Sequence, residues 1–306
     1  MSQFAQVAPP FPLAGEVASL GAALIWSCSI SLFTVFGRSV PASALNLFKN
    51  GVAMACLGVV LVVLHPPHPE DGASYAMLAA SGIVGLSLGD TALFAALKRL
   101  GAQITSASQC LAPPMAALLA ALFLGETLSP QELAGLFLTA VAIAALIYFG
   151  QRGGAQLDGL PRRTVLAGLG FALGAAFCQA SGIVLARVAM QSVHVLTGTM
   201  MRMAPALLVL IAMSVTGRSP MSLGTIFVSR RQGFWLTVAA IAGTFLGLIL
   251  MSLGAKYAKA GIVAALTSTY PIWIIPIARF GLKERVSFPS MLCTLVAVAG
   301  IVLMVL

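Results

Sequence analysis

The stretch KRLGAQITSASQCLAPPMAALLAALFLGETLS, residues 98–129, decides the fold because the chain contains it twice. Residues 256–287, KYAKAGIVAALTSTYPIWIIPIARFGLKERVS, align with it at a shift of 158 positions without a gap. The matches include a mid-helix proline, Pro113 and Pro271, and a Glu-x-x-Ser motif after each predicted helix. Alanine and leucine matches carry little weight in so apolar a chain, but these matches do. We therefore interpret the stretch as part of an internal duplication.

The composition excludes a soluble globular domain. Hydrophobic residues make up 59% of the 306 positions and charged residues 8%, whereas soluble domains carry about 25% charged residues. A helix needs about 20 apolar residues to cross a hydrocarbon core of about 30 Å. The sequence therefore predicts an all-α polytopic membrane protein with ten transmembrane helices. Their expected ranges are 17–36, 44–64, 75–97, 102–124, 132–149, 164–186, 195–215, 234–254, 260–280 and 288–306.

The duplication extends over both halves of the chain. At a shift of 153 positions Lys49 aligns with Arg202, and both are cations early in an apolar helix. The two repeats, residues 1–150 and 151–306, then hold five predicted helices each. Because five is odd, the second repeat enters the membrane from the opposite side. We predict two inverted five-helix repeats around a central cavity.

This pattern resembles the EamA-type permeases of the drug/metabolite transporter superfamily. The resemblance is carried by the segment GAALIWS with Trp26, by Lys49 and Arg202, and by the proline-containing helices that end in LGETLS and LKERVS. It implies two inverted repeats around a cavity, with the fifth and tenth helices at the periphery, and export or uptake of small metabolites. A homodimer through these two peripheral helices is a further expectation.

The Lys and Arg residues predict an orientation in the membrane. Apart from Lys49 and Arg202, 12 lie on one predicted side, and 3 on the other, namely Arg187, Lys256 and Lys259. Because Lys and Arg are in excess on the cytoplasmic side, we expect both termini outside, in a bacterial cytoplasmic (inner) membrane. The family resemblance implies the reverse orientation. The net charge of +9 is spread between apolar runs and not over one face, which argues against a nucleic-acid partner.

Prolines predict bends in the fourth and ninth helices. Proline removes a backbone hydrogen bond, and in hydrocarbon the freed carbonyl needs another partner, such as a neighbouring helix, water or a ligand. The residues concerned are Pro113, Pro114, Pro271 and Pro276. We predict that they bend the two helices around a wet cavity; a structural kink satisfied by neighbouring side chains is the alternative.

Polar and aromatic residues lie at the predicted depth of these bends. The expected substrate-binding residues are Trp26, Gln109, Gln179, Thr267, Ser268, Tyr270 and Trp273. Such a set suits a neutral or zwitterionic small molecule with an apolar or aromatic part. Serine and threonine in membrane helices also bond their own backbone or a neighbouring helix, so this role remains an alternative for them.

Three ionisable residues lie within predicted helices: Lys49, Asp90 and Arg202. The two cations could bind a carboxylate or phosphate, or anchor their helices by snorkelling. Asp90 is the candidate for proton coupling, and an ion pair with Lys98 or a bond to Thr91 is the structural alternative. The first helix has no central glutamate like that of the small multidrug exporters, which disfavours proton-driven cation efflux.

Other motifs point to neither catalysis nor metal binding. Residues 85–89 match G-x-S-x-G, but a nucleophile elbow requires a strand-turn-helix context. His65 and His68 lie in a short proline-rich connection, where we expect solvated side chains. The five cysteines lie in apolar segments without metal-ligand spacing. We expect no metal, no cofactor and no enzymatic activity.

The leading functional hypothesis is a secondary transporter of small organic metabolites, in particular an amino-acid or related metabolite exporter that works by alternating access. The alternative within transport is an anion or phosphate-ester exchanger, which requires Lys49 and Arg202 to face the cavity. An intramembrane enzyme is disfavoured because no catalytic set converges at one depth. A passive channel is disfavoured because the sequence has no ring of charges.

Overall fold

The computed structural model describes residues 13–66, 72–125, 127–152, 160–190, 193–215, 223–257, 266–283 and 286–305, and these residues form helices and no strand. The N-terminal half contains α1 (Ala14–Phe36), α2 (Ala42–Leu64), α3 (Gly72–Gly82), the π-helix η1 (Ile83–Gly89), α4 (Asp90–Ser108), the 3₁₀ turn η2 (Gln109–Leu111), α5 (Ala112–Leu124) and α6 (Pro130–Arg152). The C-terminal half contains α7 (Arg162–Met190), α8 (Val195–Val215), the 3₁₀ turn η3 (Leu223–Thr225), α9 (Arg230–Ala239), the π-helix η4 (Ala240–Leu246), α10 (Gly247–Tyr257), α12 (Tyr270–Pro276), the π-helix η5 (Ile277–Gly281) and α13 (Phe288–Val305).

Seven of the described helical segments are long and apolar enough to cross a membrane. One of them, Gly72–Phe123, extends over 52 residues and is interrupted at Gly101, where φ is 78° and ψ is 179°. Glycine adopts a positive φ without the steric penalty of a Cβ atom. The break separates two stretches that the sequence predicts as successive spans, 75–97 and 102–124. The chain is therefore an all-helical, multi-pass integral membrane protein.

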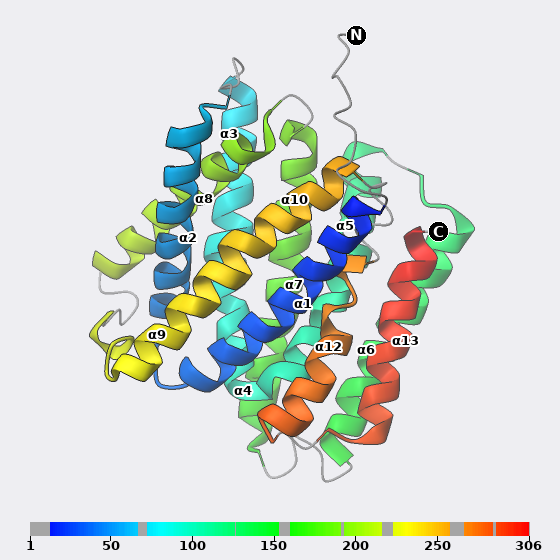
Figure 1. Cartoon of the computed structure of the whole chain (residues 1–306). Helices are drawn as coiled ribbons and strands as arrows, with labels where there is room; N and C mark the ends of the chain where they lie inside the picture. Colours follow the sequence, from blue (N-terminus) through cyan, green and yellow to red (C-terminus); the bar gives the residue numbers. More distant parts are fainter. Residues whose placement is uncertain are drawn as a thin grey trace.

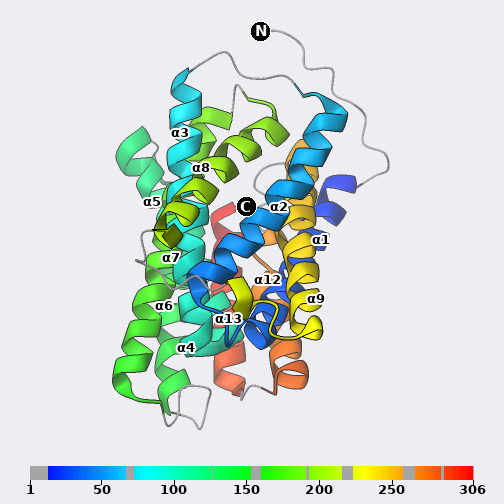
Figure 2. The same ribbon diagram turned by 90° about the vertical axis from the view of Figure 1, so that its left-hand side faces the viewer.

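The two halves of the chain interleave (Figure 1). The first helix of each half packs on the third segment of the other: α1 lies along α9, η4 and α10, and α7 lies along α3, η1 and α4. Helices α2 and α8 contact each other, as do α6 and α13. Figure 1 shows α6 and α13 along one edge of the bundle and α2 and α8 toward the other, and Figure 2 shows the same arrangement after a quarter turn.

Glycines allow α1 to approach η4 and the start of α10 closely. A Cβ atom built on Gly243 would lie 2.1 Å from Ser29 Oγ, and one built on Gly247 would lie 2.4 Å from Trp26 Nε1. Side chains at these two positions would therefore push the helices apart. Small residues at four-residue spacing are a common means of close helix packing in membranes.

Glycines also lie where α7 crosses η1. A Cβ atom on Gly89 would lie 3.0 Å from Cys178 Cβ, and one on Gly85 would lie 3.8 Å from the Cα atom of Gly182. Gly85 and Gly89 align with the glycines of η4 and α10 at the shift of 158 positions. The two crossings are thus equivalent in sequence position, and the one between α1 and η4 is packed more tightly at its first glycine.

Candidate substrate-binding site

Trp26 and Tyr270 meet where α1 crosses η4 and α12. The Trp26 Nε1 atom donates a hydrogen bond to the backbone oxygen of Gly243 at 2.9 Å, and the two aromatic rings form an edge-to-face contact with centroids 6.4 Å apart. Ser27 Oγ donates to the Tyr270 backbone oxygen at 2.8 Å, and the Tyr270 hydroxyl donates to the backbone oxygen of Ser106 at 3.3 Å. Two of the predicted substrate residues therefore connect α1, α4 and α12, while their contact with substrate remains a prediction.

The two predicted glutamines lie on the α7 side of the bundle. Gln109 Nε2 donates to the backbone oxygen of Ala172 on α7 at 3.1 Å. Gln179, also on α7, is half-buried. The Gln109 amide is therefore already engaged in a helix-to-helix bond, which is the structural alternative to a substrate contact.

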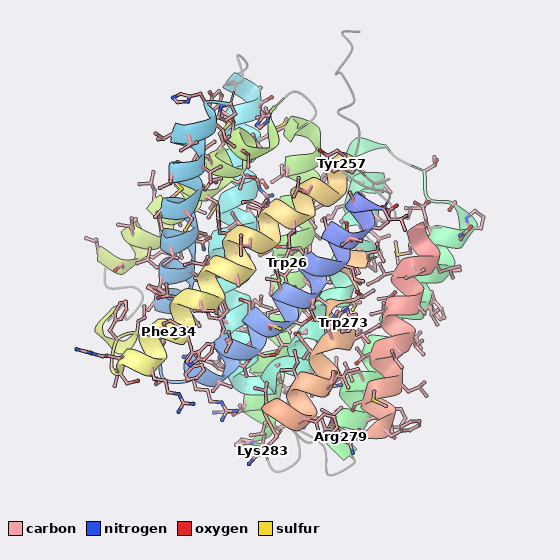
Figure 3. The ribbon with its side chains drawn as sticks, viewed as in Figure 1. Trp26, Phe234, Tyr257, Trp273, Arg279 and Lys283 are labelled. Atoms are coloured by element: carbon pink, nitrogen blue, oxygen red, sulfur yellow. The ribbon has the colours of Figure 1, made fainter. Side chains whose placement is uncertain are left out.

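The predicted residues of the ninth helix differ in burial. Thr267 is buried and Ser268 is half-buried. Trp273 is 39% exposed on α12 (Figure 3). This exposure distinguishes Trp273 from the half-buried Trp26 and Tyr270. Residues 258–265, which include the start of this predicted helix, lie outside the described residues.

The four prolines coincide with changes of helix type. Helix α4 ends at Ser108, η2 follows, and Pro113 and Pro114 lie in the first turn of α5. Pro271 lies in the first turn of α12, and Pro276 ends α12 just before the π-helix η5. Proline is well suited to a first turn because the N–H that it lacks would have no acceptor within the helix.

Lys49 and Asp90 form an ion pair inside the bundle. Lys49 Nζ lies 2.5 Å from Asp90 Oδ2, and the side chains are only 10% and 15% exposed. The alternative partner that the sequence suggested for Asp90, Lys98, is wrong, since Lys98 Nζ donates to the backbone oxygen of Val40. Helix α2 packs against α4 and places Lys49 opposite the acid. A role for Asp90 in proton coupling remains a prediction.

Asn46 is a polar residue of this site that the sequence analysis missed. Its Nδ2 atom lies 2.8 Å from the backbone oxygen of Leu86, 3.0 Å from that of Ser87 and 2.9 Å from Thr91 Oγ1. The side chain is fully buried. A signal was present in the sequence, because Asn46 lies three positions before Lys49 and such residues share one face of a helix.

Arg202 lies against α3 and η1 and takes part in no ion pair among the described residues. A Cβ atom built on Gly82 would lie 1.8 Å from the backbone oxygen of Arg202, so α8 passes directly over the end of α3. Arg202 Nη2 lies 3.9 Å from the position that a Cβ atom would take on Gly85. The charge of Asp90 acts on the guanidinium, whose Nε atom is buried without a hydrogen-bond partner in the described part of the chain.

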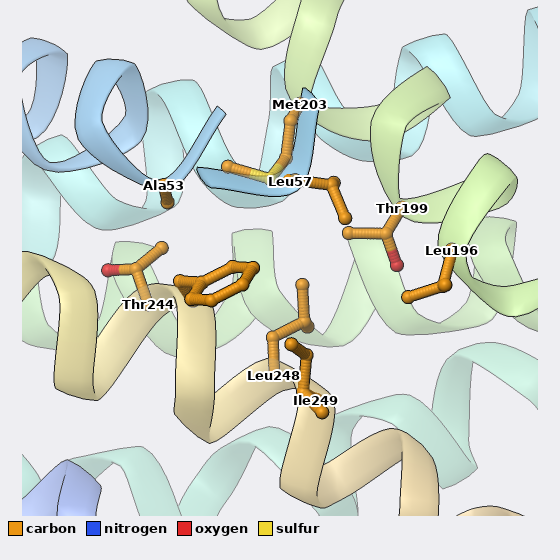
Figure 4. Close-up of a pocket in the computed structure, with 9 residues that line it drawn as sticks. Ala53, Leu57, Leu196, Thr199, Met203, Thr244, Leu248 and Ile249 are labelled. Atoms are coloured by element: carbon orange, nitrogen blue, oxygen red, sulfur yellow. The ribbon is translucent and has the colours of Figure 1, made fainter. Parts of the chain in front are cut away.

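Two small pockets open between the described helices. Each has a volume of about 10 Å³, close to the space that one water molecule needs. One lies between α1, α2 and α4, beside Phe33 and Lys98. The other lies between α2, α8 and the η4–α10 segment (Figure 4) and is lined by Ala53, Leu57, Leu196, Thr199, Met203, Thr244, Phe245, Leu248 and Ile249. Neither is lined by the predicted substrate residues, and neither is the wide central cavity that the sequence predicts.

The described residues do not form the catalytic or metal-binding arrangements that the isolated motifs could suggest. No group of three or more His, Cys, Asp or Glu side chains is placed to hold a metal ion there. The G-x-S-x-G sequence lies in η1, so Ser87 belongs to a π-helix and not to a strand-turn-helix elbow. His65 follows the end of α2, whereas His68 lies outside the described residues.

An all-helical, multi-pass bundle with interleaved halves and charged side chains at its centre is typical of membrane transport proteins. Residues 13–148 and 166–306 both match the model of the EamA-like transporter family. Because these two matches together cover most of the chain, the chain belongs to this family and is a membrane transporter of small molecules. The resemblance inferred from the sequence is confirmed.

A relative and a solved structure are similar to this chain. The chain is 33% identical over 124 residues to Uncharacterized protein PA1977 of Pseudomonas aeruginosa (strain PAO1), a match that covers 39% of this chain and 41% of that protein. The match thus spans about two fifths of the relative's length. A solved crystal structure has a TM-score of 0.65 and 16% identity, over 94% of this chain and 95% of the other. At that identity the likeness concerns the fold alone.

Proposed function

We propose that this protein is a secondary transporter of small organic metabolites, in particular amino acids or related compounds, that works by alternating access. Ten membrane-spanning segments would act as two inverted five-helix repeats, residues 1–150 and 151–306, around a shared centre. The observation that carries this proposal is the pair of equivalent crossings, α1 with η4 and α7 with η1. Each crossing joins one repeat to the other.

The directions of the helices support the inverted arrangement. In Figure 1, α1 starts on the side where the N-terminus lies and runs toward the opposite side, whereas α7 runs the other way. The first helices of the two repeats are therefore antiparallel to each other. This is the expected relation for repeats related by an axis in the membrane plane.

The crossings suggest how access could alternate. At a glycine crossing one of the two helices contributes no side chain to the contact, so the helices can pivot about the contact point with little rearrangement of side chains. If one crossing opens toward one side of the membrane while its equivalent closes, exchanging the two conformations opens the other side. The pocket between α2, α8 and the η4–α10 segment has a volume of only about 10 Å³, as we expect for an occluded state between these two.

The surroundings of the protein are part of the proposal. The Lys and Arg distribution, 12 on one side and 3 on the other, favours termini outside a bacterial inner membrane. Helices α6 and α13 pack on each other and leave Phe137 and Phe288 about 70% exposed. The predicted homodimer would use the outward faces of these two helices.

Uptake into proteoliposomes tests the function. The purified protein is reconstituted and offered amino acids, nucleosides and organophosphates, with and without a proton gradient. We expect saturable uptake of at least one amino acid or related compound, and no uptake by empty liposomes. Flux that increases linearly with concentration would indicate a channel, and saturable transport of phosphate esters alone would contradict the proposed substrate class.

A further inference from the structure

Six polar residues gather around η1 in the interior of the bundle, and we refer to them as the Arg202 cluster. They come from α2, from η1 and the first residue of α4, and from α8. The members are Asn46, Lys49, Asn50, Ser87, Asp90 and Arg202. Polar groups are rarely buried at this density inside a membrane unless they have a function.

The cluster contains one more positive charge than negative charge. Lys49 and Asp90 neutralise each other through their 2.5 Å ion pair. Arg202 is left with a buried Nε atom that has no partner among the described residues. The acid whose charge acts on this guanidinium, Asp90, is already paired with Lys49. The site therefore favours a ligand that has one negatively charged group.

The cluster also offers hydrogen-bond acceptors without donors. Asn50 Nδ2 donates to Asn46, but Asn50 Oδ1 has no partner in the described residues, and neither has Ser87 Oγ. Both residues are almost completely buried. A buried polar atom without a partner lowers stability until a ligand or water satisfies it. A ligand with an ammonium or hydroxyl group near its anionic group would provide the missing donor.

We propose that Arg202 binds the carboxylate of the transported metabolite, while Asn50 Oδ1 and Ser87 Oγ accept hydrogen bonds from an ammonium or hydroxyl group on its adjacent carbon. This inference rests on the proposed transport function and names its substrate class: α-amino acids and related α-hydroxy acids. A guanidinium can bind a carboxylate through two parallel hydrogen bonds. A phosphate ester with two negative charges would need a second free cation, and Lys49 is already paired with Asp90.

An apolar pocket is lined by α2 and α8, which also carry residues of this cluster, and it could receive the rest of the ligand (Figure 4). Met203, the neighbour of Arg202 in α8, and Ala53, one turn after Asn50 in α2, both line it. Its present volume of about 10 Å³ admits no more than one water molecule. An aliphatic side chain would therefore enter only when α2, α8 and η4 move apart, as alternating access requires.

Ligand-induced thermal stabilisation of the purified full-length protein in detergent tests the proposal. The probes are L-leucine, 2-hydroxy-4-methylpentanoate, isopentylamine, which lacks the carboxylate, and inorganic phosphate. We expect stabilisation that saturates for the first two compounds and none for isopentylamine or phosphate. Stabilisation by isopentylamine or phosphate to the same extent would overturn the proposal, as would no stabilisation by either acid.

Substitutions of Arg202 assign the effect to its guanidinium. We expect Arg202→Gln to weaken the binding of both acids at least about tenfold, because a buried charge pair loses one partner. Arg202→Lys keeps the charge without the planar fork and should give an intermediate affinity. The matched control is Arg279→Gln, because Arg279 is exposed on η5, and its affinity should equal that of the unsubstituted protein. Equal affinity in Arg202→Gln would overturn the proposal.

The proteoliposome assay separates this inference from the proposed function. If Arg202→Gln still transports L-leucine with an unchanged KM, the protein is a transporter but Arg202 is not its carboxylate site. If the unsubstituted protein transports no compound of the panel at all, the proposed function itself fails. Loss of L-leucine transport in Arg202→Gln, with normal transport in Arg279→Gln, supports both the proposed transport function and the role of Arg202 as the carboxylate site.

Discussion

Asn46 donates side-chain hydrogen bonds to backbone oxygens of η1. A π-helix widens the turn and disturbs the regular pattern of backbone bonding. In hydrocarbon a free carbonyl has no water to bond. The Asn46 amide lies within 3.0 Å of the backbone oxygens of Leu86 and Ser87, so one side chain from α2 stabilises the irregular segment. Trp26 has a comparable role at η4, where it donates to the backbone oxygen of Gly243.

The charges of the Arg202 cluster lead to an unequal effect of two substitutions. Asp90→Asn leaves two buried cations, Lys49 and Arg202, without a counter-charge and should lower the free energy of unfolding by about 3–5 kcal/mol. Lys49→Met leaves one acid, Asp90, and one cation, Arg202, so the cluster becomes neutral. The free energy of unfolding should therefore decrease less. Thermal denaturation in detergent measures both.

The control for this pair is Lys283→Met, since Lys283 is exposed and its replacement should leave the melting temperature unchanged. Equal decreases in the free energy of unfolding for Asp90→Asn and Lys49→Met would mean that Asp90 does not stabilise the charge of Arg202. The three-charge description of the cluster would then be wrong.

At the scale of the element, the third segment of each half departs from regular α-helix at the same place in its repeat. Both contain a seven-residue π-helix, η1 at Ile83–Gly89 and η4 at Ala240–Leu246. Both also carry a G-x-x-x-G spacing that meets the first helix of the other repeat. Hydropathy predicts these segments as ordinary spans, because it is insensitive to the pattern of backbone bonding. The G-x-x-x-G spacing was the feature of the sequence that could have indicated these close helix crossings.

The glycine crossing can be tested with a matched pair of substitutions. Gly243→Ala places a methyl group 2.1 Å from Ser29 Oγ, and such overpacking should lower stability by about 1–3 kcal/mol and reduce transport. Gly58→Ala on α2 meets no atom within 4 Å and should keep transport and stability. Melting temperature and proteoliposome uptake are the two measurements.

A second substitution can relieve the contact. Ser29→Gly removes the atoms that the new methyl group would meet, so the combination Gly243→Ala with Ser29→Gly should regain part of the stability. Some loss should persist, because Ser29 Oγ also donates to the backbone oxygen of Ala239 at 2.7 Å. No recovery at all would show that the crossing is not limited by this contact.

At the scale of the whole molecule, orientation is the property that cysteine labelling decides. Single cysteines are placed at Gln6 and Gln156 after replacement of the five native cysteines, and cells are treated with an impermeant thiol reagent. Because Lys and Arg concentrate on the side of residue 156, we expect labelling from outside at Gln6 only. A permeant reagent should label both positions. Outside labelling at Gln156 alone would reverse the assignment.

The sequence predicted features that depend on local composition or on comparison of the chain with itself. Apolar run length predicted a multi-pass helical protein, and the duplication led to the family that the comparison confirmed. The sequence also identified Lys49, Asp90 and Arg202 as ionisable residues within predicted membrane helices. It did not predict which of them pair, since Lys49 and Asp90 lie 41 positions apart and meet only because α2 packs on α4.

The sequence by itself determined that this protein is a duplicated, helical membrane transporter, because the transfer of each segment into hydrocarbon depends on its own residues. The tertiary structure alone decided that Asp90 neutralises Lys49, that the Arg202 Nε atom lacks a hydrogen-bond partner among the described residues, and that Trp26 reaches the backbone of η4. These outcomes depend on the packing of helices distant in sequence. Packing brings donors, acceptors and charges within the few ångströms over which hydrogen bonds and ion pairs form.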